Sequence, residues 1–169
     1  MIVPIVREET WLPVIAILPV WQPPLRPAVV IAPHPDDETL GAGALIALLR
    51  RRGCEVTVIA VTDGENCYPG EDPGDLRDTE QTAALARLGV DAHHIHRLHL
   101  PDSGLGQYEE ALYARLLDLV PADAHLIAPW EGDFHPDHEV CGRVAIRLAK
   151  AKGLLLTSYF FWTWHRGTP

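Results

Sequence analysis

The stretch that decides the fold is AVVIAPHPDDE, residues 28–38. Residues 28–32 form a continuous apolar run closed by Pro33, which is the pattern of a strand buried on both faces. Such strands belong to parallel sheets covered by helices on both sides. A histidine and three acidic residues follow at once, at the sheet edge where such folds bind their ligands. The stretch therefore predicts a buried parallel strand with a polar site at its carboxyl end.

Strand-like and helix-like segments alternate through the rest of the chain. The apolar and β-branched runs predict further strands at 55–62, 95–100, 125–129 and 154–161. Helical periodicity predicts helices at 39–52, 76–88, 108–120 and 136–150, and a Gly/Pro-rich acidic loop occupies 64–74. This order predicts a three-layer, Rossmann-like α/β domain with a mostly parallel sheet of about five strands and helices on both faces.

The segment before the first strand, residues 1–27, is expected to be an extended Pro-rich arm, because its six prolines exclude a long helix. Residues 28–169 are expected to form a single domain. Gly41 and Gly43 do not make a dinucleotide-binding loop, because Ile46 occupies the place of the third glycine. Close packing of a helix on the sheet is the preferred interpretation of these glycines.

The composition excludes several classes of function. The net charge is −9 over 169 residues, with no basic stripe, so neither nucleic acid nor an anionic membrane is an expected partner. The apolar run at 11–21 is too short to span a bilayer and contains Pro13 and Pro19, so membrane insertion is not expected. Three cysteines without C-x-x-C spacing favour a reducing compartment, and no signal-peptide pattern is evident, so we expect a cytoplasmic protein.

The first chemical cluster places His34, Asp36, Asp37 and Glu38 within five residues. Carboxylates this close repel one another, and a divalent cation would remove that penalty. Histidine with carboxylate suits zinc, and because adjacent Asp side chains point in different directions, one can bind metal while the other reaches the attacking water. Helix capping explains one or two of the acids and stays an alternative for Glu38.

The second cluster is GDFHPDH, residues 132–138, which follows the predicted strand 125–129 and so faces the same sheet edge. Pro136 suits the first position of a helix, so His135 at the cap and His138 in the first turn can face one site. Asp137 can hold a neighbouring imidazole in one tautomer. Together the two clusters supply the three N/O ligands of an open catalytic zinc site.

These two clusters resemble the signature motifs of the PIG-L/LmbE-like zinc-dependent N-acetylglucosamine deacetylases. The resemblance extends over roughly residues 28–165 and includes RDTE at 77–80, LPDSG at 100–104 and the aromatic run FWTWH at 161–165. It implies a hydrolase that removes an N-acetyl group from an amino sugar or a related small conjugate. Members of the family usually continue well beyond the aromatic run, so the domain is expected to be short at its C-terminus.

Carried over residue by residue, the resemblance implies three metal ligands: His34, Asp37 and His138. Asp36 would be the general base for the attacking water. A positively charged His135 would stabilise the oxyanion, and Asp137 would orient His135. The implied substrate contacts are Arg77 and Asp102, and Glu38 would support the ligands from behind. Zinc is the expected metal, and Fe(II) and Co(II) are alternatives because they suit the same ligands.

Several alternatives stay open. Another metal-dependent hydrolase, acting on phosphoesters, could use the same ligands, although phosphate usually calls for more cationic side chains than Arg77 alone. An inactive binding relative is a second alternative, and a homo-oligomer stays open. Three tryptophans could stack on a sugar ring or belong to the core: Trp130, Trp162 and Trp164.

Overall fold

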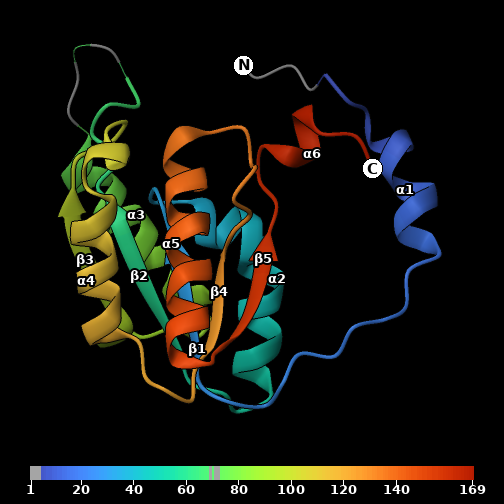
Figure 1. The fold of residues 1–169 in the computed structure, drawn as a ribbon, viewed down its shortest axis with the longest axis horizontal. Coiled ribbons are helices and arrows are strands. Elements are labelled where there is room, and N and C mark those ends of the chain that lie inside the picture. The colour runs from blue at the N-terminus through green and yellow to red at the C-terminus, as the bar shows by residue number, and fades with distance from the viewer. Residues whose placement is uncertain (1–4, 69, 71–72) are drawn as a thin grey trace.

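The computed structural model describes residues 5–68, 70 and 73–169. Parts of two predicted segments lie outside the described residues: 1–4 of the N-terminal arm, and 69 and 71–72 of the loop. The described residues form a sheet of strands β1 (Ala28–Ala32), β2 (Val56–Thr62), β3 (Ile95–Leu100), β4 (His125–Pro129) and β5 (Leu155–Tyr159). The strand order is β3-β2-β1-β4-β5, and every neighbouring pair is parallel. The predicted parallel sheet is confirmed (Figure 1).

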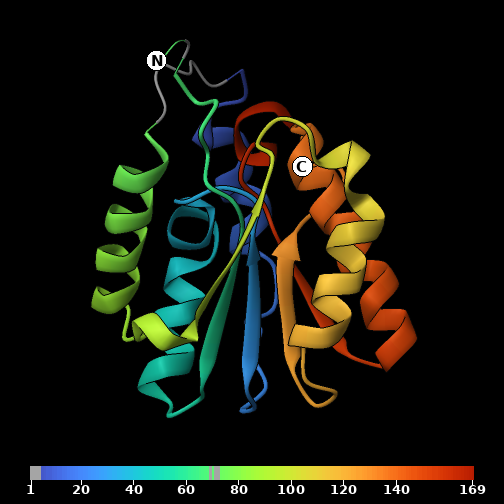
Figure 2. The ribbon, with the colours of Figure 1, turned by 90° about the vertical axis from the view of Figure 1, so that its left-hand side faces the viewer.

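Helices cover both faces of this sheet, as Figure 2 shows from its edge. The pair α2 (Asp37–Arg51) and α3 (Gly74–Arg87) lies on one face, and the pair α4 (Glu109–Leu119) and α5 (Pro136–Lys152) lies on the other. Successive residues of β1 alternate between the two cores: Val29 and Ile31 join one, and Val30 joins the other. Since both faces are buried, β1 has to be apolar throughout, and the three-layer α/β prediction is confirmed.

Helix boundaries differ most at the first cluster. The sequence predicts a helix from residue 39, but α2 begins at Asp37, so Asp37 and Glu38 lie in its first turn and are buried. Short elements that the sequence analysis did not predict are α6 (Thr163–Arg166) and the 3₁₀ turns η1 (Ala92–His94) and η2 (Leu105–Gln107). The 3₁₀ turn η2 and the short helix α6 adjoin the loops that line the candidate site.

The prediction of an extended arm is wrong for α1 (Glu8–Ala16), which is helical despite Pro13. Tertiary contact explains this helix. Trp11 is buried, packs edge-on against Trp164 with ring centroids 4.9 Å apart, and donates from Nε1 to the Trp164 carbonyl at 3.1 Å. Figure 1 shows α1 beside α6 and outside the three layers. Among the described residues, no helix is both long and apolar enough to cross a membrane.

Two glycines let helices approach the sheet closely. A Cβ on Gly41 would lie 2.5 Å from the ring of Tyr159, which confirms the packing interpretation for Gly41, whereas a Cβ on Gly43 would make only an ordinary contact with Leu88 at 3.7 Å. A Cβ on Gly142 would lie 2.6 Å from the Glu131 nitrogen and 2.8 Å from the Pro129 carbonyl. The close approach at Gly142 sets the distance between α5 and the end of β4. It therefore sets the shape of the loop that holds the second cluster.

We expect Gly142→Ala to destabilise the fold by about 1–3 kcal/mol, because the new methyl group has to displace backbone atoms. Urea denaturation of the two proteins measures the change. The matched control is Gly106→Ala, where no described atom lies within 4 Å of the added Cβ. Equal stabilities of the two variants would contradict the proposed packing constraint.

Candidate active site

The loops after all the described strands meet in one pocket of about 390 Å³. The β1 and β4 loops contribute the two polar clusters, and the β5 loop contributes Phe161 and Trp162. Arg77 of α3 completes one side, and the β2 and β3 loops contribute Asn66, Cys67, Asp102 and Ser103. The pocket therefore lies at the carboxyl edge of the sheet, where the sequence analysis expects it.

Asp37 lies between the two predicted histidine ligands. Its Oδ2 is 3.1 Å from Nδ1 of His34 and 3.1 Å from Nε2 of His138. The His34 and His138 ring centroids are 5.4 Å apart, and the side chains of Asp37 and His138 are almost completely buried. The structure thus brings together the three residues that the sequence analysis expects to bind metal.

The geometry fits a divalent cation. Atoms that share a tetrahedral zinc ion at bond lengths of about 2.0–2.1 Å lie about 3.3 Å apart, close to the separations observed around Asp37. His138 Nε2 is buried and makes no well-aligned hydrogen bond to any described residue, although Asp37 is near. A ring nitrogen left without a hydrogen bond beside a carboxylate is suited to donate its lone pair to a metal ion.

Further carboxylates hold the outer nitrogens of both imidazoles. His34 Nε2 lies 3.2 Å from Asp102 Oδ1 and 3.3 Å from Asp137 Oδ2. His138 Nδ1 lies 2.9 Å from Asp133 Oδ2. A carboxylate behind a histidine fixes the ring and its tautomer, and this is the usual support of histidine ligands at metal centres.

The pKa values in the cluster are shifted because several carboxylates surround the two imidazoles. Burial alone would lower the pKa of His34, but the carboxylates of Asp102, Asp137 and Asp37 raise that pKa to about 11. Burial would raise the pKa of Asp37, but the neighbouring imidazoles of His138 and His34 hold it well below its usual range. Without a metal ion, protons on the imidazoles supply the positive charge that the buried carboxylates require.

Asp36 faces the pocket while its neighbour Asp37 contacts the imidazoles, as expected for adjacent acids. Its φ of 143° is a conformation that costs non-glycine residues about 1–3 kcal/mol and that concentrates at functional sites. Burial and the charge of Asp37 raise the pKa of Asp36 to about 6. Arg77 Nη2 donates to Asp36 Oδ2 at 3.1 Å and to the Pro35 carbonyl at 2.7 Å. Arg77 therefore fixes Asp36 instead of standing free in the pocket.

His135 lies beside the two proposed ligands, with its ring centroid 4.9 Å from that of His34 and 5.0 Å from that of His138. Its Nδ1 accepts a hydrogen bond from the Asp137 backbone N–H at 3.3 Å. Burial and the neighbouring imidazoles His34 and His138 lower its pKa. The structure therefore favours a neutral His135 that donates through Nε2, instead of the positively charged ring expected from the resemblance.

The carboxylate of Asp137 does not contact His135, the partner expected from the resemblance. It accepts from the backbone N–H groups of Ser103 at 2.8 Å and Leu105 at 3.2 Å, and it contacts His34. Pro136 begins α5, so the backbone N–H of Asp137 is free to bind His135 while its side chain reaches the loop after β3. Asp137 thus contacts His135 through its main chain and not through its carboxylate.

Two other predicted residues take supporting positions. Asp102 lines the pocket, but its carboxylate also contacts His34 and accepts from the Asn66 N–H at 3.0 Å. Glu38 is fully buried and accepts from Gln81 Nε2 at 3.0 Å and from the Thr39 hydroxyl at 2.9 Å. Glu38 therefore ties α2 to α3 beneath the first cluster.

Sequence reasoning missed Asp133 and left the role of the aromatic run undecided. Asp133 is fully buried and contacts His138, and the only sequence signal was its position in the GDFHPDH run. Of the three tryptophans, Trp162 lines the pocket and stacks on His135 at 6.2 Å, Trp130 packs on Phe160, and Trp164 packs on Trp11. Trp162 is thus the one placed to meet a ligand.

Two groups of closely spaced ligand atoms occur among the described residues, and both contain His34 but not Asp37. One comprises the imidazoles of His34, His135 and His138, and the other comprises His34, Asp102 and Asp137. The 3.1 Å contacts of Asp37 with both His34 and His138 favour Asp37 as the third ligand. His135 remains the neighbouring donor.

We expect zinc at about 100 times its dissociation constant to raise the free energy of unfolding by about 2.7 kcal/mol, because the unfolded chain has no assembled site. His138→Ala should abolish this increase. The control is His96→Ala, which changes an exposed histidine on β3. Thermal unfolding with and without zinc measures the effect, and an equal response of His138→Ala and the parent chain would contradict the site.

Comparison with known proteins identifies the family that the two clusters resemble. Residues 29–149 match the PIG-L family, described as GlcNAc-PI de-N-acetylase. A 1D-myo-inositol 2-acetamido-2-deoxy-alpha-D-glucopyranoside deacetylase of Mycobacterium sp. (strain KMS) is 32% identical over 160 residues, covering 77% of this chain and 52% of the relative. A probable N-acetyl-alpha-D-glucosaminyl L-malate deacetylase 2 of Bacillus subtilis (strain 168) is 33% identical, covering 70% and 58%.

A solved structure shares the fold. The N,N'-diacetylchitobiose deacetylase of Pyrococcus horikoshii superimposes with a TM-score of 0.65 at 25% identity, over 80% of this chain and 60% of that one. The chain therefore spans between half and two thirds of the length of these relatives. The matched region contains both polar clusters, the whole of α2 and most of α5. The chain belongs to the PIG-L family of deacetylases.

Proposed function

We propose that this chain is a metal-dependent hydrolase that removes the N-acetyl group from an amino sugar or a related small conjugate. The observation that carries the proposal is that Asp36 and His135 line one pocket beside the His34–Asp37–His138 cluster. Relatives matched over this region deacetylate N-acetylglucosamine conjugates of inositol and malate. An acetamide is the group that a base, a hydrogen-bond donor and a metal site in one pocket are suited to hydrolyse.

Each residue of the pocket has a separate role in the proposed reaction. Asp36, which Arg77 holds, would take a proton from the attacking water. The Nε2–H of His135 would donate to the oxygen of the acetamide as negative charge develops there. A divalent ion held by His34, Asp37 and His138 would polarise the carbonyl and acidify the water, and zinc suits these ligands, with Fe(II) and Co(II) as alternatives.

The pocket walls support a sugar more than a phosphate ester. Phe161 and Trp162 offer aromatic faces, and Trp162 is partly exposed to the pocket. The cation that lines the pocket, Arg77, donates to Asp36 and to the carbonyls of Pro35 and Gly64, so three of its N–H groups are engaged by the chain itself. Phosphate recognition normally needs free cationic donors.

The setting of the enzyme follows from the same features. The cysteines Cys54, Cys67 and Cys141 are unpaired, which suits a reducing compartment, and we propose the cytoplasm. The partner is a small N-acetylated molecule, and the acidic net charge of −9 disfavours nucleic acid.

We expect Asp36→Asn to lower kcat for acetate release by about 10²–10⁴-fold, because the amide cannot accept the proton of the attacking water. Metal content should stay unchanged, since Asp36 is not one of the proposed ligands. Acetate release is measured with N-acetylglucosaminyl inositol, N-acetylglucosaminyl malate and N,N'-diacetylchitobiose.

The matched control is Asp118→Asn, which removes the same charge from an exposed position on α4. Unchanged turnover in Asp36→Asn would exclude Asp36 as the base. Hydrolysis of an aryl phosphate, without acetate release from any of the three sugars, would replace the proposed activity with phosphoester hydrolysis.

A further inference from the structure

Asp133 is a fully buried carboxylate in the loop between β4 and α5. Both of its oxygens are used. Oδ2 lies 2.9 Å from His138 Nδ1 and accepts from the Trp162 N–H at 3.1 Å. Oδ1 accepts from the N–H groups of Phe161 at 3.0 Å and Thr163 at 2.9 Å, and from the Thr163 hydroxyl at 2.6 Å. A buried carboxylate with this many donors is held in one orientation.

The contact with His138 sets which nitrogen of that ring is available. A carboxylate accepts and cannot donate, so it requires the proton of His138 to lie on Nδ1. Nε2 then carries the lone pair, and Nε2 is the buried nitrogen that lies 3.1 Å from Asp37. An asparagine in place of Asp133 could present an N–H to Nδ1 and stabilise the opposite tautomer, in which Nε2 is protonated and cannot bind metal.

The remaining contacts of Asp133 hold the aromatic wall of the pocket. Phe161 and Trp162 line the pocket, and Phe161 packs edge-on against His138 at 5.8 Å. Trp162 stacks on His135 at 6.2 Å with an interplanar angle of 16°. Since Asp133 accepts from the main chain of 161–163, one side chain fixes both the His138 ring and the wall around it.

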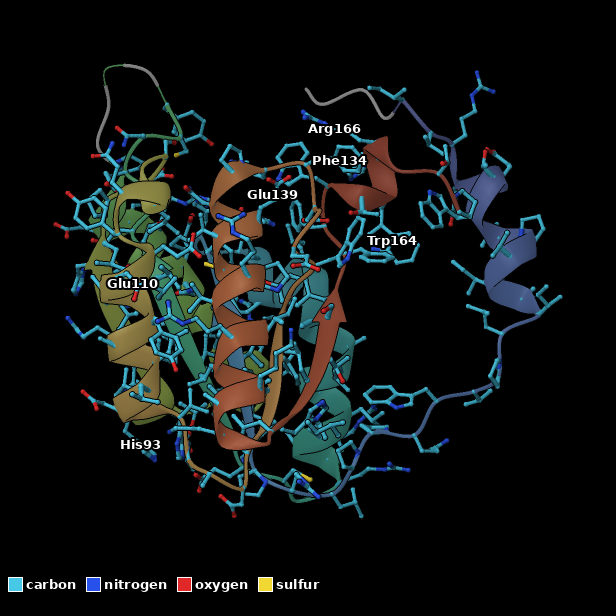
Figure 3. The ribbon with its side chains drawn as sticks, viewed as in Figure 1. His93, Glu110, Phe134, Glu139, Trp164 and Arg166 are labelled. Atoms are coloured by element: carbon cyan, nitrogen blue, oxygen red, sulfur yellow. The ribbon has the colours of Figure 1, made fainter. Side chains whose placement is uncertain are left out.

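The backbone next to Asp133 also connects the loops after β4 and β5. Phe134 has a φ of 58°, which is uncommon for a side chain of this size, and it directs the chain from Asp133 toward the cap of α5. Arg166 Nη1 donates to the Phe134 carbonyl at 3.5 Å. Figure 3 shows Phe134 and Glu139 at the N-terminal end of α5, with Arg166 of α6 close to Phe134. The loops after β4 and β5 are thus joined at one point.

We propose that Asp133 is a positioning residue of the metal site: it orients His138 with Nε2 toward Asp37 and locks the Phe161–Trp162 wall to the helix that carries the ligand. This inference rests on the proposed metal-dependent function. Its test needs no substrate, so it can be separated from a failure of the deacetylase proposal. A chain that binds zinc but releases no acetate would leave the role of Asp133 standing.

The first measurement uses the unaltered full chain loaded with zinc. Long-range ¹⁵N–¹H spectra of labelled histidine report which ring nitrogen of His138 carries the proton, with His138→Gln used to assign the signal. We expect the proton on Nδ1 and the metal on Nε2. Metal on Nδ1, or no zinc bound by the unaltered chain, would overturn the proposal even if every variant of Asp133 failed to fold.

The second measurement is the zinc affinity of Asp133→Asn, obtained by competition with a chromophoric chelator. We expect an affinity about 10–100-fold weaker, the usual effect of losing a carboxylate behind a histidine ligand. The matched control is Thr163→Val, which removes the hydroxyl contact with Asp133 Oδ1 and leaves the His138 contact in place.

Thr163→Val should lose stability in urea but keep its zinc affinity. Equal affinities of Asp133→Asn and the unaltered chain would show that Asp133 does not position the ligand. Equally weakened affinities in both variants would show that the contacts of Asp133 hold the fold in general and not His138 in particular, which would also overturn the proposal.

Discussion

The parallel pairing of β1 with β4 is the constraint on which the rest of the site depends. In the register that aligns Ala28 with His125 and Val30 with Ile127, the two strands end side by side at the same edge. The loop after β1 therefore meets the loop after β4, and His34 and Asp37 meet His138. A strand order in which β1 and β4 were not neighbours would separate these residues. The close approach of α5 at Gly142 then fixes the height at which the second cluster stands above the sheet.

A second constraint is electrostatic. Buried acids collect around two imidazoles, and each acid has a specific partner: Asp37 binds both rings, Asp102 and Asp137 hold His34, and Asp133 holds His138. Carboxylates withdrawn from water need positive charge or hydrogen-bond donors close by. The same arrangement that raises the proton affinity of the imidazoles suits the cluster to a cation, since a metal ion can replace the protons on the inner nitrogens while the outer carboxylates stay in place.

The sequence predicted the strands well, and it predicted which polar residues meet at the sheet edge, because those features are local. An apolar run of five residues has to be a buried strand, and a polar motif directly after it has to lie at the sheet edge. The roles of single carboxylates were harder. The partners of Asp137 are His34 and the loop after β3, and Asp133 binds residues 161–163, so each role depends on segments far apart in the chain. The helix α1 was missed for the same reason, because Trp11 is held by Trp164 and not by local propensity.

The separation of the two motifs along the chain has a consequence for the order of assembly. His34 and Asp137 are 103 residues apart, and the β2 and β3 units lie between them. The entropic cost of closing a loop rises by only about 0.6 kcal/mol for each doubling of its length. Contacts between residues this far apart in the chain nevertheless form slowly. We therefore expect the pocket to form only when β4 docks on β1, late in folding. A metal ion would then bind a completed scaffold and slow its unfolding, instead of nucleating the fold.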